Sequence, residues 1–178
     1  MDAKTVWRGH DRMANGRIEL LTEMMALRQH DASSGWFVPA SQALLGLTAP
    51  QAAWVPPGEG THTIWQLVSH LTFWTRVVTQ HLDGVPVHQR DNEATFGPPG
   101  DPEDAAGWSA ALEALSQAYD GLRAAVGRQR DADLDRRLGD RRGTPAGRMV
   151  GGILSHDAYH IGQIVLLRKL QGSWSPEA

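Results

Sequence analysis

Two histidines, His156 and His160, lie four residues apart within an otherwise apolar run near the C-terminus. At 100° per residue, His156, His160 and Gln163 fall within roughly 60° of one another on one side of a helix. The same side carries apolar residues, namely Met149, Ile153, Ile164 and Leu167. We therefore expect this side to face a core, where two imidazoles are costly unless their nitrogens are satisfied. A divalent cation that binds one nitrogen of each satisfies them, so the spacing predicts a metal site.

A third ligand is available in the preceding amphipathic segment, where His70 is flanked by Leu67, Leu71 and Trp74. This position places His70 at the edge of an apolar stripe, from which it would point into a helical bundle. His81 cannot share the ion, because it lies about 16 Å further along the helix axis. Three neutral imidazoles leave at least one coordination position for water or substrate, as in catalytic sites.

The remaining histidines are weaker candidates. His62 stands at the start of a predicted helix, where we expect a terminal or surface group. His10, His30 and His88 have polar surroundings and are expected to be solvated.

Three neighbours of the paired histidines could support a metal. Tyr159 and Gln163 lie on the edges of the same stripe, where they either orient bound water or a substrate oxygen, or simply pack. Asp157 occupies the place of the glutamate in the His-Glu-x-x-His helix of zinc peptidases, but its side chain is one methylene shorter and no third ligand follows. We therefore interpret Asp157 as a surface residue or as a partner of a metal ligand, and we do not favour a peptidase.

Composition limits the class of protein. The chain has 178 residues, which we interpret as one domain, residues 1–178. It has no cysteine, which excludes disulfides, thiolate ligands and a cysteine nucleophile, so any metal must be held by nitrogen and oxygen. A net charge of -3 without a basic cluster argues against a nucleic-acid partner. No apolar run is long enough for a membrane span or secretory signal, so we expect a cytoplasmic protein.

Helical periodicity dominates, and no segment shows sustained alternation of apolar and polar residues, which predicts an all-α bundle. Helices are expected at residues 11–29, from about residue 36 to Leu47, from residue 62 or 63 to 82, from an N-cap at Asp101 to about 126, and from about 148 to 171. The intervening loops at 85–101 and 127–147 are longer than usual connections between helices. They either line a site or simply meander.

With these residues placed, the chain resembles the DinB/YfiT superfamily of four-helix-bundle proteins, whose members are often described as metal-dependent hydrolases. The similar segments are Gly60–Trp74, Leu154–Gln163 and Gly35–Thr48. The resemblance begins at about residue 35 and covers most of the chain after it. It implies a four-helix bundle in which His70, His156 and His160 bind a divalent metal, zinc or nickel. Residues 1–34 would form an additional N-terminal helical extension packed on the bundle, and one expectation is a homodimer through this segment.

The superfamily includes thiol S-transferases and isomerases in which the metal activates the thiol of bacillithiol, mycothiol or glutathione. The resemblance therefore implies a metal-dependent transferase or hydrolase that acts on a small-molecule substrate, with a low-molecular-weight thiol such as bacillithiol as cosubstrate. We expect the substrate to enter the bundle past Trp36, Trp74 and Tyr159. Despite the DinB name, the chain does not resemble the DNA polymerase that shares it.

Two other functions are compatible with the sequence. A non-catalytic metal-binding stress-response protein would have a closed coordination sphere, with a fourth protein ligand such as Glu19 or Asp157 and no adjacent cavity. A purely structural bundle used for association would bind no metal.

Overall fold

The computed structural model describes residues 16–29, 37–87, 91–140 and 142–175. These residues form six α-helices: α1 (Gly16–Gln29), α2 (Ala40–Leu44), α3 (Ala49–Ala52), α4 (Ile64–Leu82), α5 (Ala105–Gly127) and α6 (Ala146–Leu170). Two short 3-10 helices, η2 (Glu93–Thr95) and η3 (Asp131–Asp135), lie in the long loops. The described part of the chain contains no β-strand beyond one isolated bridge between Arg137 and Pro145. The expected all-α class is therefore confirmed.

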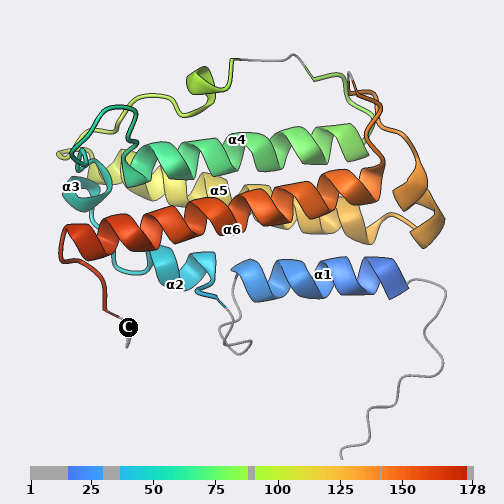
Figure 1. Cartoon of the computed structure of the whole chain (residues 1–178), viewed down its shortest axis with the longest axis horizontal. Coiled ribbons are helices and arrows are strands. Elements are labelled where there is room, and N and C mark those ends of the chain that lie inside the picture. Colours follow the sequence, from blue (N-terminus) through green and yellow to red (C-terminus); the bar gives the residue numbers. More distant parts are fainter. Residues whose placement is uncertain (1–15, 30–36, 88–90, 141, 176–178) are drawn as a thin grey trace, which may run out of the picture.

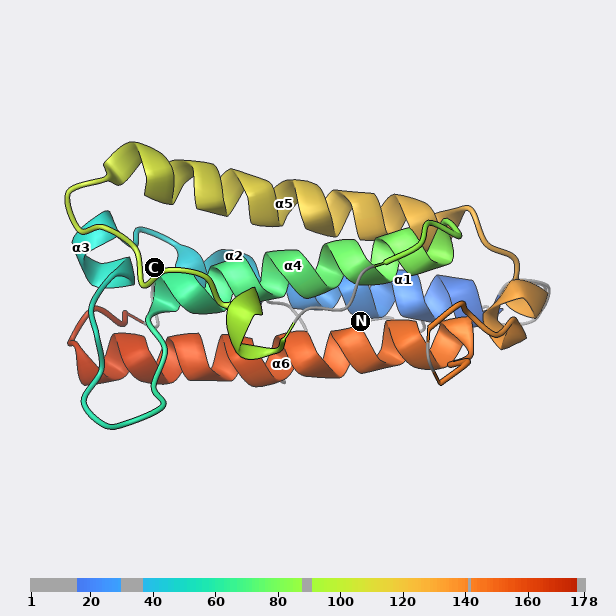
Figure 2. The same cartoon turned by 90° about the horizontal axis from the view of Figure 1, so that it is seen from above.

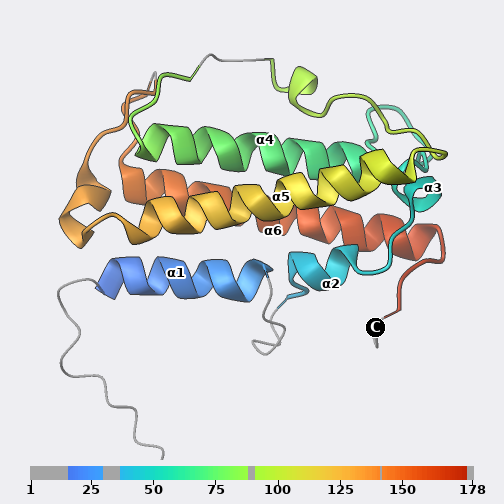
Figure 3. The same cartoon turned by 180° about the vertical axis from the view of Figure 1, so that it is seen from behind.

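The three longest helices run alongside one another, and α1 and α2 lie end to end along the bundle (Figures 1 and 3). α4 packs on both α5 and α6, while α1 contacts α5 and α6 and α2 contacts α6. The view from above shows α5 and α6 on opposite sides of α4 (Figure 2). The fourth position of the bundle is thus shared between α1 and α2, rather than α1 forming an additional layer.

α4 begins and ends where its sequence predicts. Thr63 caps the N-terminus, since its hydroxyl accepts from the Gln66 backbone N–H while the Gln66 side chain accepts from the Thr63 N–H. The helix ends at Leu82, and Gly84 follows with a φ of 73°, which glycine adopts without strain. The predicted apolar stripe is buried except for the half-buried Trp74, so α4 turns its His70 edge towards α6.

Two predicted boundaries are wrong. The stretch expected to be helical from about residue 36 to Leu47 already ends at Leu44 in α2, because Gly46 turns the chain with a φ of 70°; Leu45 is 52% exposed, and α3 is a separate helix that begins at Ala49. The N-cap of α5 is Asp104, not Asp101. The Asp104 carboxylate accepts from the Gly107 N–H, whereas Asp101 closes a preceding turn.

The interior consists of two apolar clusters, one towards each end of the bundle. One is built mainly from residues 40–52 and the N-terminal halves of α4 and α5, and the other from α1, η3, the C-terminal ends of α4 and α5 and the N-terminal half of α6. None of the described helices combines the length and apolar character that crossing a bilayer requires. The paired histidines of α6 and His70 of α4 lie along the seam between these two helices.

Candidate metal centre

α4 and α6 bring the three predicted ligands together. Nε2 of His156 lies 3.1 Å from Nε2 of His70 and 3.1 Å from Nε2 of His160. One ring nitrogen from each histidine lies within 4.8 Å of the others. In a tetrahedral site with zinc–nitrogen bonds of about 2.0–2.1 Å, ligand nitrogens lie about 3.3 Å apart. The three histidines could therefore hold one metal ion.

The cluster is buried on one side and open on the other. His70 is 2% exposed and His160 is 6% exposed, so both rings are inside the bundle. The side chain of His156 is 28% exposed. His156 is therefore the member of the cluster that solvent reaches most.

Hydrogen bonds fix the proton positions in two of the rings. Nδ1 of His70 lies 2.6 Å from the Thr95 hydroxyl, which donates its own proton to the Asn92 carbonyl. Thr95 must therefore accept a proton from Nδ1 of His70. Nδ1 of His160 likewise donates to the Gln163 side-chain carbonyl at 2.6 Å. In both rings Nε2 is consequently unprotonated, and its lone pair is directed at His156.

Neutral side chains alone cannot satisfy this arrangement. If His156 carries its proton on Nε2, it can donate to only one of the two facing lone pairs. If it carries the proton on Nδ1, three lone pairs converge. Nδ1 of His156 is buried and has no hydrogen-bond partner among the described residues; it lies 3.7 Å from Oδ1 of Asp157, a residue that is 2% exposed. A cation is thus the complement that the donor set lacks.

The electrostatics keep the rings in the form that binds metals. Burial, together with the adjacent rings of His160 and His156, lowers the pKa of His70 to about 3. Burial also lowers the pKa of His160, although the hydrogen bond that His160 donates to Gln163 acts in the opposite direction. Both imidazoles are therefore neutral at pH 7, as metal coordination requires.

The long loop before α5 forms a wall of the site. The sequence alone did not decide whether this loop lines a site or meanders. η2 supplies Thr95, and the next residue, Phe96, inserts its ring between His62 and His70 at centroid distances of 3.7 and 3.8 Å. His62, which was expected to be a terminal or surface group, lies just before the N-cap of α4 and is half-buried, with its ring stacked on Phe96. Neither Thr95 nor Phe96 carries a periodic signal, since a three-residue 3-10 helix and the residue that follows it are too short to show one.

The other candidate residues are placed as follows. Tyr159 is 64% exposed, and its ring lies 4.9 Å from that of His160. Trp74 is half-buried, with its ring edge-on to His70 at 6.3 Å. Glu19 is exposed on α1 and does not belong to the cluster. Trp36 lies outside the described residues.

The family of this chain follows from comparison with known proteins. Neither a curated protein nor a solved structure matches it. A family model described as the DinB superfamily matches residues 40–164, which is more than half of the 178 residues and includes all three histidines. The chain therefore belongs to the DinB superfamily.

Proposed function

We propose that this protein is a metal-dependent enzyme in which Nε2 of His70, His156 and His160 hold one divalent cation. The proposal rests on the convergence of the three rings: Nε2 of His156 lies 3.1 Å from Nε2 of both His70 and His160. Hydrogen bonds from Nδ1 to Thr95 and Gln163 leave Nε2 of His70 and His160 unprotonated and able to bind a metal. Zinc and nickel both suit imidazole ligands, so the site favours either metal over magnesium or calcium.

The proposed reaction is thiol S-transfer or hydrolysis on a small molecule. A divalent cation lowers the pKa of a bound thiol or water, which supplies a nucleophile near neutral pH in a chain without cysteine. The superfamily includes transferases that use low-molecular-weight thiols, and we propose a bacillithiol-type cosubstrate on that resemblance.

The surrounding side chains have distinct roles in this proposal. Thr95 and Gln163 hold the rings of His70 and His160 with Nε2 turned inwards. Oδ1 of Asp157 lies 3.7 Å from Nδ1 of His156, which is too far for a hydrogen bond, but its negative charge favours a proton on Nδ1 and leaves Nε2 of His156 free to bind a metal. Tyr159 and Trp74 lie beside the cluster and offer surfaces to a substrate.

Two observations favour an enzyme over a non-catalytic metal-binding protein. Among the described residues, the cluster of possible metal ligands consists of the three histidines, and no fourth side chain joins it. Asp157, a candidate for the fourth ligand, approaches Nδ1 of His156 rather than the nitrogen shared with the other two rings. A coordination position is thus left for substrate on the side where His156 is exposed.

The test combines metal content with turnover. We expect purified protein to contain one zinc or nickel ion per chain by elemental analysis, and to consume bacillithiol in the presence of an epoxide or chlorinated electrophile. Treatment with 1,10-phenanthroline should abolish this activity, and added metal should restore it. The variant His156→Ala should lose both metal and activity, whereas His81→Ala, on the far end of α4, should keep both.

Other results would assign a different function. Activity that persists in the metal-free protein would refute the mechanism. Stoichiometric metal without turnover of any tested thiol or ester would indicate a non-catalytic binder. Protein that takes up neither zinc nor nickel would indicate a structural bundle.

A further inference from the structure

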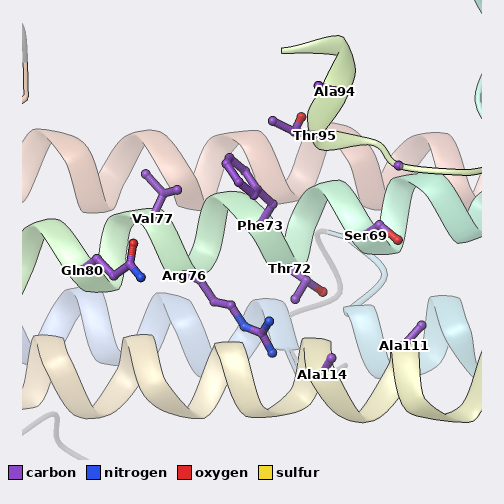
Figure 4. Close-up of a pocket in the computed structure, with 11 residues that line it drawn as sticks. Ser69, Thr72, Phe73, Arg76, Val77, Gln80, Ala94, Thr95, Ala111 and Ala114 are labelled. Atoms are coloured by element: carbon purple, nitrogen blue, oxygen red, sulfur yellow. The ribbon is translucent and has the colours of Figure 1, made fainter. Parts of the chain in front are cut away.

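A groove of about 430 Å³ runs along α4; Thr95, the hydrogen-bond partner of His70, is part of its lining, and none of the three histidines is. Figure 4 shows its walls: Ser69, Phe73 and Arg76 from α4, Ala94 and Thr95 from the loop, and Ala111 and Ala114 from α5. The alanines of α5 leave the space open. A volume of this size is within the range of small-molecule sites.

Arg76 is the one charged side chain among the described residues that line the groove. It extends from α4 towards Ala114 (Figure 4). Its guanidinium makes no hydrogen bond or ion pair with any residue that the structure describes, whereas Arg17 and Arg128 each pair with an aspartate. The groove therefore contains an unneutralised cation with five N–H donors and no competing carboxylate.

The rest of the lining indicates the chemistry of a ligand. Ser69 and Gln80 add neutral hydrogen-bonding groups along the same face of α4. Phe73 and Val77 form an apolar wall opposite the alanines. A guanidinium binds a carboxylate through two parallel hydrogen bonds, while an aromatic or aliphatic group can cover the apolar wall.

We propose that this groove binds a small organic carboxylate, with the carboxylate on Arg76 and the apolar part of the ligand against Phe73. The bound molecule would lie beside Thr95, the residue that accepts the hydrogen bond from His70. The groove is thus a second binding site next to the metal centre. It does not depend on the function proposed for that centre.

Benzoate is a suitable probe, and benzamide is its neutral analogue. Backbone and alanine methyl signals of isotope-labelled full-length protein would be followed by NMR during titration with each compound. Benzoate should shift the Ala111 and Ala114 methyl signals saturably, and benzamide should not. Because a carboxylate could also bind a metal ion, the titration is repeated with the neutral chelator 1,10-phenanthroline, which should leave the shifts unchanged.

Matched variants assign the binding to the groove. Arg76→Gln should weaken benzoate binding by about tenfold or more, since a charged hydrogen-bond partner is lost. Arg148→Gln, which removes the same charge from an exposed position of α6 outside the groove, should leave the affinity unchanged. Ala114→Leu should block binding by filling the groove while Arg76 remains.

Three results would each overturn the proposal. They are a wild-type titration without saturable shifts at the groove, equal benzoate affinity in Arg76→Gln and wild type, and binding that disappears with the chelator. All three can be read in protein whose fold is checked by the dispersion of the same spectra.

Discussion

Replacing Thr95 by valine should weaken metal binding without moving any proposed ligand. Thr95 is 5% exposed and holds Nδ1 of His70 at 2.6 Å. Valine keeps the branched shape and removes the acceptor. In the metal-free variant His70 can move its proton to Nε2 and donate to His156, which lies 3.1 Å away. The metal-bound form cannot do so, because its Nε2 must be unprotonated.

The loss of affinity follows from this asymmetry. In the metal-bound variant the Nδ1–H of His70 is buried without an acceptor, which costs about 1–3 kcal/mol. At about 1.4 kcal/mol for each factor of ten, the dissociation constant should rise by roughly 5- to 150-fold. Substitutions of groups that orient metal ligands typically weaken binding by about 10- to 100-fold, which agrees with this range.

The assay is competition for zinc against a chromophoric chelator of known affinity, with thermal unfolding as a check on the fold. Thr79→Val is the matched control, because its hydroxyl donates to the Thr75 carbonyl within α4, away from the histidines. The control should bind zinc as the wild type does. Equal zinc affinities in Thr95→Val, Thr79→Val and wild type would refute the role of Thr95.

Three further predictions use different parts of the structure. A saturating metal, at 100 times its dissociation constant, should raise the free energy of unfolding by about 2.7 kcal/mol, seen as a higher Tm; an unchanged Tm would contradict a native metal site. Asp157→Asn should weaken zinc binding about tenfold in the same competition assay, and exposed Asp120→Asn should not; a loss in both would argue against a local effect. Gly100→Ala should destabilise the fold by about 1–3 kcal/mol in urea unfolding, because Gly100 has a φ of 94° and a Cβ there would lie 2.5 Å from the Trp65 ring. Gly121→Ala, which meets no atom within 4 Å, is its control, and equal stabilities of the two variants would contradict this close contact.

The parts of the site that lie on long helices could be predicted from the sequence. The period of α6 placed His156, His160 and Gln163 on one side, and the stripe of α4 placed His70 at its edge. In the structure the two helices bury these faces against each other with the three histidines at the same height, so the rings meet. Gln163, predicted either to orient a group or to pack, holds the ring of His160.

The parts that lie in loops could not be predicted. Thr95 and Phe96 reach His70 through a tertiary contact across 25 and 26 residues of sequence, which no local periodicity encodes. The N-cap of α5 was ambiguous for a related reason: Asp101 and Asp104 are both capping residues, and only the turn between them shows which one closes the helix. In such segments the backbone conformation and the side-chain contacts depend on which distant residues pack against the loop.

The most direct test of the metal centre is a crystal structure of the protein grown with zinc or nickel, with anomalous differences collected at the absorption edge of the metal. We expect one strong peak within bonding distance of Nε2 of His70, His156 and His160, with density for water or another small ligand completing the coordination. A fully loaded crystal with no peak between these three rings, or with the ion bound elsewhere in the chain, would contradict it.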